Sequence, residues 1–274
     1  MQFIVHNSKI IPANEFALSS ANRSFMYGDS VFETMVFKHG KIRFLEDHLE
    51  RLFQGLKALS ISKEFYQSEI TEAVSALLKE ENLENARLKL QAYRKEGGLV
   101  QPMQNDAEWI LSAAPLIIPS FLKNKCGVYN EIPNRFSKIS RFKTGNFLPY
   151  VLASIEKKEL GLDEMIILDV ENNISECTTS NIFWLKGHTL YTPSIETGCI
   201  EGIMRKQIFR WSRENNIQIL EGKFKIEELN NADVVFTCNV SGICAIHEIT
   251  NNAYKNTNPG INRTFKQLAS EFNL

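Results

Sequence analysis

The sequence predicts an α+β protein of two domains, and three observations support this fold class. Amphipathic helices and alternating strands occur in both halves, without the strict strand–helix–strand order of a parallel α/β sheet. The length of 274 residues exceeds that of one typical domain. Pro115 and Pro119 cannot donate to a sheet ladder, so the stretch around residue 118 is predicted to be a connector. We therefore place an N-terminal domain at residues 1–115, a connector at 116–123 and a C-terminal domain at 124–274.

The N-terminal half alternates strands and helices. Residues 31–37 favour a strand that ends at a His39-Gly40 turn. Leucines and Phe53 recur at three- and four-residue steps over residues 45–59, which predicts an amphipathic helix, and a second helix follows over residues 70–78. Strands are expected at residues 87–94 and 109–114.

The C-terminal half is richer in strands. Pro149 suits the first turn of a helix that ends near Gly161. The strands at residues 165–170, 182–185 and 189–192 are predicted to form a β-meander. A helix opens at Gly202 and runs to about residue 216. The last strand pair, 234–238 and 243–249, brackets the loop at residues 239–242.

Composition excludes several classes of protein. Lys+Arg 31 against Asp+Glu 32 leaves no basic footprint for nucleic acid. No apolar run approaches the roughly 18 residues of a membrane span, and the first residues do not resemble a signal peptide. Five cysteines without a C-x-x-C pair favour neither a disulfide framework nor a zinc site, and no other metal motif is present. We expect a cytoplasmic globular protein with no metal, membrane or nucleic-acid partner.

A few charged residues lie at unusual positions, but local pattern alone leaves their roles open. Arg94 continues the strand face of Leu88, Leu90 and Ala92, so either the strand has ended and the side chain is solvated, or a cation is available to a carboxylate. Arg51 flanks the apolar stripe of its helix, where a solvated position is equally ordinary. No local feature of the sequence distinguishes Lys143 or Glu176 from ordinary surface residues.

Five segments, taken together, resemble the class IV aminotransferase family, the pyridoxal-phosphate enzymes of fold type IV. Residues 27–34 (YGDSVFET) resemble the family's Y-G-D-G-V-F-E block, and residues 48–52 (HLERL) its H-x-x-R-L helix. Residues 143–146 (KTGN) resemble the lysine block K-x-x-N. The hairpin at 169–183 and the GIMR turn at 202–205 complete the series in the expected order. The resemblance implies a smaller N-terminal α/β domain and a larger C-terminal mixed β domain.

The resemblance also implies a cofactor, pyridoxal 5′-phosphate, and the residues that hold it. Lys143 would bind the cofactor as a Schiff base and then serve as general base. Glu176 would keep the pyridine nitrogen protonated. The phosphate would be held by the Arg51 guanidinium and by main-chain donors. These donors would come from Ile203 and Met204 and from the turn Ser241, Gly242 and Ile243.

Within this family, the segment at residues 174–187 is most similar to 4-amino-4-deoxychorismate lyases. The expected reaction converts 4-amino-4-deoxychorismate to 4-aminobenzoate and pyruvate, a step in folate precursor synthesis. Thr34 would act as a second catalytic residue, and Arg94 and Tyr27 would bind the substrate. Phe147 stands where transaminases of the family often have tyrosine.

Two other functions remain open for the sequence. One is a class IV aminotransferase acting on branched-chain or D-amino acids, in which Lys143 moves the same proton to a different atom. The other is a non-catalytic binding protein. Family membership further implies a homodimer with a small amino-group substrate.

Overall fold

The structure, a computed structural model, describes residues 2–63, 65–118, 120–252, 254–255 and 262–274. The chain forms two compact units, Met1–Ile117 with Phe142–Asn146, and Ile118–Arg141 with Phe147–Leu274. The division between residues 117 and 118 lies inside the connector expected at residues 116–123. The return of Phe142–Asn146 to the first unit has no sequence signal, and it carries Lys143 with it.

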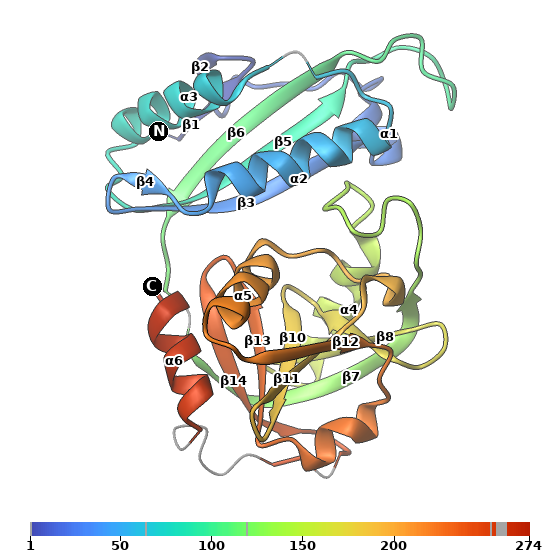
Figure 1. Ribbon diagram of the computed structural model, residues 1–274. Coiled ribbons are helices and arrows are strands. Elements are labelled where there is room, and N and C mark those ends of the chain that lie inside the picture. The colour runs from blue at the N-terminus through green and yellow to red at the C-terminus, as the bar shows by residue number, and fades with distance from the viewer. Residues whose placement is uncertain (1, 64, 119, 253, 256–261) are drawn as a thin grey trace. The chain divides into compact units, whose positions relative to one another are not determined.

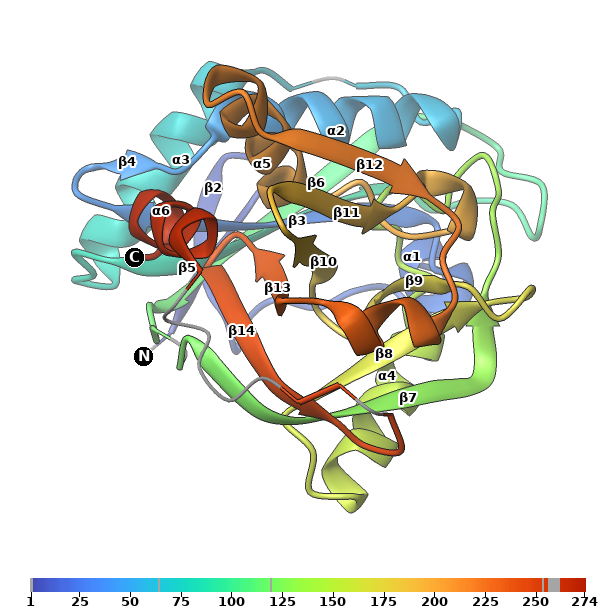
Figure 2. The ribbon, with the colours of Figure 1, turned by 60° about the horizontal axis from the view of Figure 1, so that its bottom comes forward.

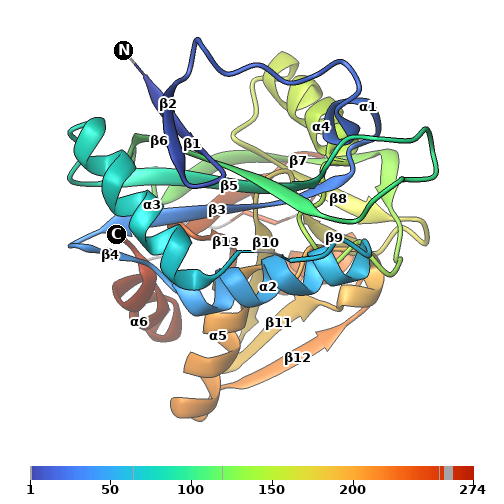
Figure 3. The same ribbon diagram turned by 90° about the horizontal axis from the view of Figure 1, so that it is seen from above.

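The first unit is an antiparallel sheet with two long helices on one face. Its strands lie in the order β2-β1-β6-β5-β3-β4. Helices α2 and α3 cover the same face of this sheet (Figure 3). A short helix, α1, precedes β3. The elements are α1 (Arg23–Tyr27), α2 (Leu45–Ala58), α3 (Gln67–Glu80), β1 (Phe3–His6), β2 (Lys9–Pro12), β3 (Ser30–Lys38), β4 (Lys41–Ile42), β5 (Ala86–Arg94) and β6 (Ala107–Pro115).

The core of this unit lies between the helices and the sheet, and Figure 1 shows α2 running along the strands. Alternate residues of β5, namely Leu88, Leu90 and Ala92, are fully buried in it. Helix α2 carries Glu46 and Asp47 in its first turn and Lys57 in its last, which matches the helix dipole. The strands and helices predicted for residues 31–114 are therefore confirmed, with small differences at their ends.

Phe142–Asn146 extends the first sheet along β3. Thr144 forms an antiparallel bridge with Val31. The Phe32 N–H donates to the Lys143 carbonyl oxygen at 2.8 Å, and the Gly145 N–H donates to the Ser30 carbonyl oxygen at 2.8 Å. Because β4 pairs only with the far end of β3, this edge of the strand accepts the added segment.

The second unit is built on a mixed sheet in the order β12-β11-β10-β13-β14-β7-β8-β9. Strand β7 pairs in parallel with both β14 and β8, and Figure 2 shows β7 and β14 side by side. The strands are β7 (Leu122–Asn134), β8 (Glu164–Asp169), β9 (Ile174–Cys177), β10 (Asn181–Lys186), β11 (Thr189–Pro193), β12 (Gln218–Gly222), β13 (Val234–Asn239) and β14 (Gly242–Ile249). The helices are α4 (Leu148–Glu159), α5 (Ile203–Glu214) and α6 (Arg263–Phe272), with 3-10 turns at Ile195–Thr197 and Ile226–Asn231.

The predicted β-meander is wrong in its first step. Strands β10 and β11 form the expected hairpin, but β8 does not pair with β10. Instead, β8 pairs with the four-residue strand β9, and β10 pairs with β13. No helix in the part of the chain that the structure describes is long and apolar enough to cross a membrane.

Candidate active site

Lys143 and Thr34 belong to the same face of the first sheet. The Lys143 Nζ atom lies 4.9 Å from the centroid of the Phe32 ring. Thr34 is two residues further along β3, so it points to the same side as Phe32. The intervening Glu33 points the other way, toward α2. The two residues predicted to be catalytic therefore share the face opposite the helices.

A second lysine on this face has no signal in the sequence motifs. Lys89 lies directly opposite Thr34 in the register of β3 and β5. Its Nζ atom is 5.0 Å from the centroid of the Phe32 ring. The face thus carries a hydroxyl and two amines within the reach of a few residues.

The segment that carries Lys143 fits closely against β3. A Cβ atom added at Gly145 would lie 2.5 Å from Ser30 Oγ and 2.6 Å from the Gly28 carbonyl oxygen. The second of these is a backbone atom and cannot rotate away. Glycine at position 145 is therefore a condition for the pairing that places Lys143.

Arg51 is held by a buried carboxylate of its own unit. Its Nε and Nη2 atoms donate to the two oxygens of Glu33 at 2.7 and 2.6 Å. His48 Nδ1 lies 2.6 Å from Glu33 Oε2. Burial alone would raise the pKa of Glu33, but the Arg51 charge and the His48 and Arg51 hydrogen bonds outweigh burial and lower that pKa to about 2. The pair fixes the plane of the guanidinium that is predicted to hold phosphate.

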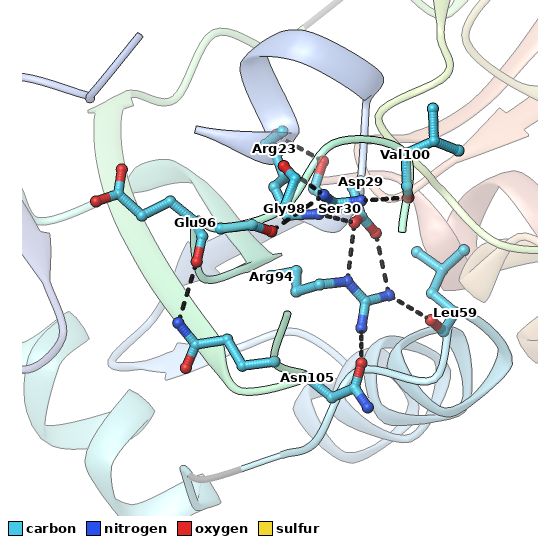
Figure 4. A network of polar contacts seen from close by, with 12 residues as sticks. Arg23, Asp29, Ser30, Leu59, Arg94, Glu96, Gly98, Val100 and Asn105 are labelled. Atoms are coloured by element: carbon cyan, nitrogen blue, oxygen red, sulfur yellow. Dashed lines mark hydrogen bonds and ion pairs between the residues drawn. The ribbon is translucent and has the colours of Figure 1, made fainter. Parts of the chain in front are cut away.

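Arg94 is buried, as the strand pattern allows, but its donors serve the chain itself (Figure 4). Its Nε and Nη2 atoms donate to the carboxylate of Asp29 at 2.8 and 3.3 Å. The remaining N–H groups reach Asn105 and the carbonyl oxygens of Leu59 and Ser60. Arg94 also lies on the helix-covered face with Leu88 and its neighbours, opposite to Thr34. A substrate carboxylate would have to displace these acceptors, so we do not assign Arg94 to substrate binding.

Tyr27 ends the short helix α1 and is exposed. The Arg23 guanidinium lies 5.1 Å from the centroid of its ring. Arg23 also donates to Asp29 at 2.9 Å and to carbonyl oxygens of residues 97–100. These contacts give no direct sign of substrate binding, and the role of Tyr27 stays a prediction.

Glu176 lies in β9 of the second unit and is 3% exposed. Three donors converge on its Oε1 atom. They are the Tyr150 hydroxyl at 2.6 Å, the Ile200 N–H at 3.0 Å and Asn134 Nδ2 at 3.3 Å. Hydrogen bonds of this kind favour the ionised form of a carboxylate.

The N-terminus of α5 lies next to this carboxylate along the chain and in space. Ile203 and Met204 occupy the first helical positions, and Gly202 before them provides no side-chain cap. Asn181 Nδ2 donates to the Ile200 carbonyl oxygen at 2.8 Å, while a Cβ atom at Gly202 would lie only 1.9 Å from Asn181 Oδ1. Asn181 thereby ties the approach to α5 to the start of β10.

The turn between β13 and β14 is adjacent, because Asn181 pairs with Cys238. Two of its predicted donors are already used. The Ser241 N–H donates to Asn239 Oδ1 at 2.9 Å, and the Ile243 N–H donates to Asn273 Oδ1 at 2.7 Å. We therefore do not count these N–H groups as phosphate donors. Gly242 has a φ of 135°, which favours glycine in this turn.

The predicted residues thus form two sets, one in each unit. The first unit brings together Lys143 and Thr34 and holds Arg51 on Glu33. The second unit gathers Glu176, the start of α5 and the Ser241 turn around Asn181. The sequence motifs do not reveal the partners Glu33, Lys89, Asn134, Tyr150 and Asn181, because their contacts depend on sheet register and long-range packing.

Comparison with known proteins gives consistent similarities. The family model for amino-transferase class IV matches residues 30–249. A putative branched-chain-amino-acid aminotransferase of Methanocaldococcus jannaschii is 26% identical over 98% of this chain and 96% of its own. An aminodeoxychorismate lyase of Bacillus subtilis is 29% identical over 85% of this chain and 81% of its own. The fold is similar, with a TM-score of 0.86 and 21% identity, to a T.th. branched-chain amino acid aminotransferase solved with pyridoxamine 5′-phosphate, over 99% of this chain and 92% of that one.

Proposed function

Because the chain belongs to the class IV aminotransferase family, whose members are enzymes that use pyridoxal 5′-phosphate, we propose that it is an aminodeoxychorismate lyase. Its reaction would convert 4-amino-4-deoxychorismate to 4-aminobenzoate and pyruvate. The B. subtilis relative of that name supports this choice, as does the hydroxyl of Thr34 on the face of Lys143.

The residues present fit the cofactor. Lys143 supplies the amine that binds it. Glu176 is a buried carboxylate of the kind that a pyridinium nitrogen requires. Arg51, already oriented by Glu33, and the first N–H groups of α5 would bind the phosphate. The Ser241 hydroxyl is the donor that we assign to the neighbouring turn.

When bound, pyridoxal phosphate supplies an electron sink for the carbon that carries the substrate amine. Lys143 takes the proton from that ring carbon. The bond between the neighbouring carbon and the enolpyruvyl oxygen then breaks, and the ring becomes aromatic. Thr34 delivers a proton to the departing enolpyruvyl group, which leaves as pyruvate.

The observation that carries the lyase assignment is the shared face of Thr34 and Lys143. Elimination needs a proton donor for the departing group in addition to the base, whereas amino exchange needs only the base. A hydroxyl two residues from Phe32, on whose ring the Lys143 amine lies, provides that donor. Lys89, opposite Thr34, replaces Arg94 in our proposal as the cation for a substrate carboxylate.

A branched-chain aminotransferase is the second candidate. The M. jannaschii relative that covers 98% of this chain carries that name, and the same lysine could move the proton in amino exchange. The sequence lacks an Arg-x-His pair after Arg94, which disfavours D-amino acids.

One experiment separates these candidates. Purified protein reconstituted with pyridoxal phosphate is incubated with 4-amino-4-deoxychorismate, and separately with leucine or D-alanine plus 2-oxoglutarate. The lyase predicts equal amounts of 4-aminobenzoate and pyruvate, and a large loss of both in Thr34→Val, which removes only the hydroxyl at similar volume. Glutamate formation without 4-aminobenzoate would support the aminotransferase instead.

We further propose that the chain is a homodimer. Leu99, Val100 and Met103 are 79%, 83% and 82% exposed, an unusual apolar cluster for a free surface. Light scattering on the purified chain should give twice the mass of 31.3 kDa. A monomer at micromolar concentration would contradict this.

A further inference from the structure

The hydroxyl of Tyr150 belongs to the environment of Glu176, although no motif includes it. Tyr150 lies in the first turn of α4, and its hydroxyl donates to Glu176 Oε1 at 2.6 Å. This is the shortest of the three hydrogen bonds described above, since Ile200 N and Asn134 Nδ2 are at 3.0 and 3.3 Å from the same oxygen.

The phenol keeps its proton and therefore acts as a donor. Burial, and next the negative charge of Glu176, raise the pKa of Tyr150 well above its ordinary value. An ionised carboxylate can only accept hydrogen bonds, so the direction of the contact is determined. Such a charge-assisted bond is stronger than one between neutral groups.

The ring of Tyr150 is held in place by its neighbour. Phe147 stacks on it with centroids 4.3 Å apart and planes at 22°. The stacked pair fixes the direction in which the hydroxyl points. Thus Phe147, which lacks a hydroxyl, orients the one that Tyr150 carries.

We infer that Tyr150 is a positioning residue that keeps Glu176 ionised and its carboxylate in one orientation, and so keeps the proton on the pyridine nitrogen of the cofactor. The inference rests on the proposed function, since it requires Glu176 to face that nitrogen. A donor to the anionic form lowers the pKa of a carboxylate, which leaves the shared proton on the ring rather than on Glu176. With Oε1 held by Tyr150, the ring N–H would be met by Oε2.

The test compares three full-length proteins loaded with pyridoxal phosphate: wild type, Tyr150→Phe and Tyr129→Phe. Tyr129 is a matched control because it belongs to the same cluster of α4, β7 and β8, and its hydroxyl makes no hydrogen bond to the residues described. Each protein is titrated with pH while the absorbance of the bound cofactor is followed. Cofactor affinity and steady-state kinetics are measured alongside, and Glu176→Gln is included as the reference for loss of the carboxylate charge.

In Tyr150→Phe we expect the midpoint of the absorbance titration to rise by about one pH unit, in the same direction as in Glu176→Gln, because a less protonated ring withdraws less charge from the lysine linkage. The value of kcat should fall roughly tenfold, with KM and cofactor affinity within about twofold of wild type. Tyr129→Phe should match wild type in every measurement.

Two negative outcomes have different meanings. If wild type takes up the cofactor and Glu176→Gln moves the midpoint, but Tyr150→Phe behaves like Tyr129→Phe, the role of Tyr150 is refuted and the proposed function stands. If Glu176→Gln leaves the midpoint and kcat unchanged, the assignment of Glu176 itself fails, and the role of Tyr150 fails with it.

Discussion

At the scale of single residues, the Glu33–Arg51 pair shows how one side chain can serve stability and binding together. Glu33 is 1% exposed and its charge is compensated by Arg51 and by His48. Removing one partner of such a pair leaves a buried charge without compensation, which typically costs about 3–5 kcal/mol. A single Arg51 variant therefore cannot by itself report on phosphate binding.

A double variant separates the two roles of Arg51. We expect Arg51→Ala to lower the free energy of unfolding by about 3 kcal/mol or more and to weaken cofactor binding. Adding Glu33→Gln removes the uncompensated charge, so most of the stability should return in urea denaturation. Cofactor affinity should stay at least roughly tenfold below that of Glu33→Gln alone. Full recovery of affinity in the double variant would mean that Arg51 does not bind the phosphate.

The same carboxylate predicts a pH dependence of stability. The pKa of Glu33 falls from 4.5 to about 2 on folding, so its contribution is complete above about pH 4.5 and is lost as pH falls toward 2. This loss is on the order of 3 kcal/mol. Denaturation at a series of pH values should show a flatter acid decline in Glu33→Gln than in wild type. Parallel curves would contradict the paired state of Glu33.

Arg94 shows why its role could not be predicted from the strand pattern. Alternation correctly places Arg94 on the face of Leu88, Leu90 and Ala92 and allows for its burial. It does not tell which face of the sheet the helices cover. The acceptors, Asp29, Leu59, Ser60 and Asn105, come from separate segments and are brought together only by the fold (Figure 4).

At the scale of elements, the long periodic segments were predictable and the short strands were not. Helices α2 and α3 and strands β3 and β5 have enough repeats of their period to be identified. Strand β9 has only four residues, so the periodicity predicts a meander that omits it. Tyr150 has no sequence signal for a related reason, because its partner Glu176 is 26 residues away and β9 determines where that partner lies.

The segment Phe142–Asn146 provides the test at this scale. Gly145→Ala would place a methyl group against the Gly28 carbonyl oxygen and push the segment away from β3. We expect about 1–3 kcal/mol lower stability and a marked loss of cofactor retention, because Lys143 moves with the segment. Gly127→Ala is the control, since its methyl group meets only the end of the Leu162 side chain. Equal cofactor retention in both variants would show that the pairing with β3 does not position Lys143.

At the scale of the whole molecule, the proposed functional residues are divided between the two units. Lys143, Thr34 and Arg51 belong to the first, and Glu176, the start of α5 and the Ser241 turn belong to the second. The sequence motifs identify most of these residues only in combination, because no single one has a local signal. The chemistry of a lysine amine, a buried carboxylate and an arginine on separate elements is what a pyridoxal-phosphate enzyme needs.

The proposed function depends above all on Lys143 as the residue that binds the cofactor. The most direct measurement is reduction of the reconstituted protein with borohydride, followed by proteolysis and mass spectrometry of the labelled peptide. We predict one phosphopyridoxyl group per chain, attached to Lys143, and none in Lys143→Ala, while Lys89→Ala retains the label. A label on Lys89 or another lysine, or a protein that takes up no pyridoxal phosphate, would contradict the proposed function.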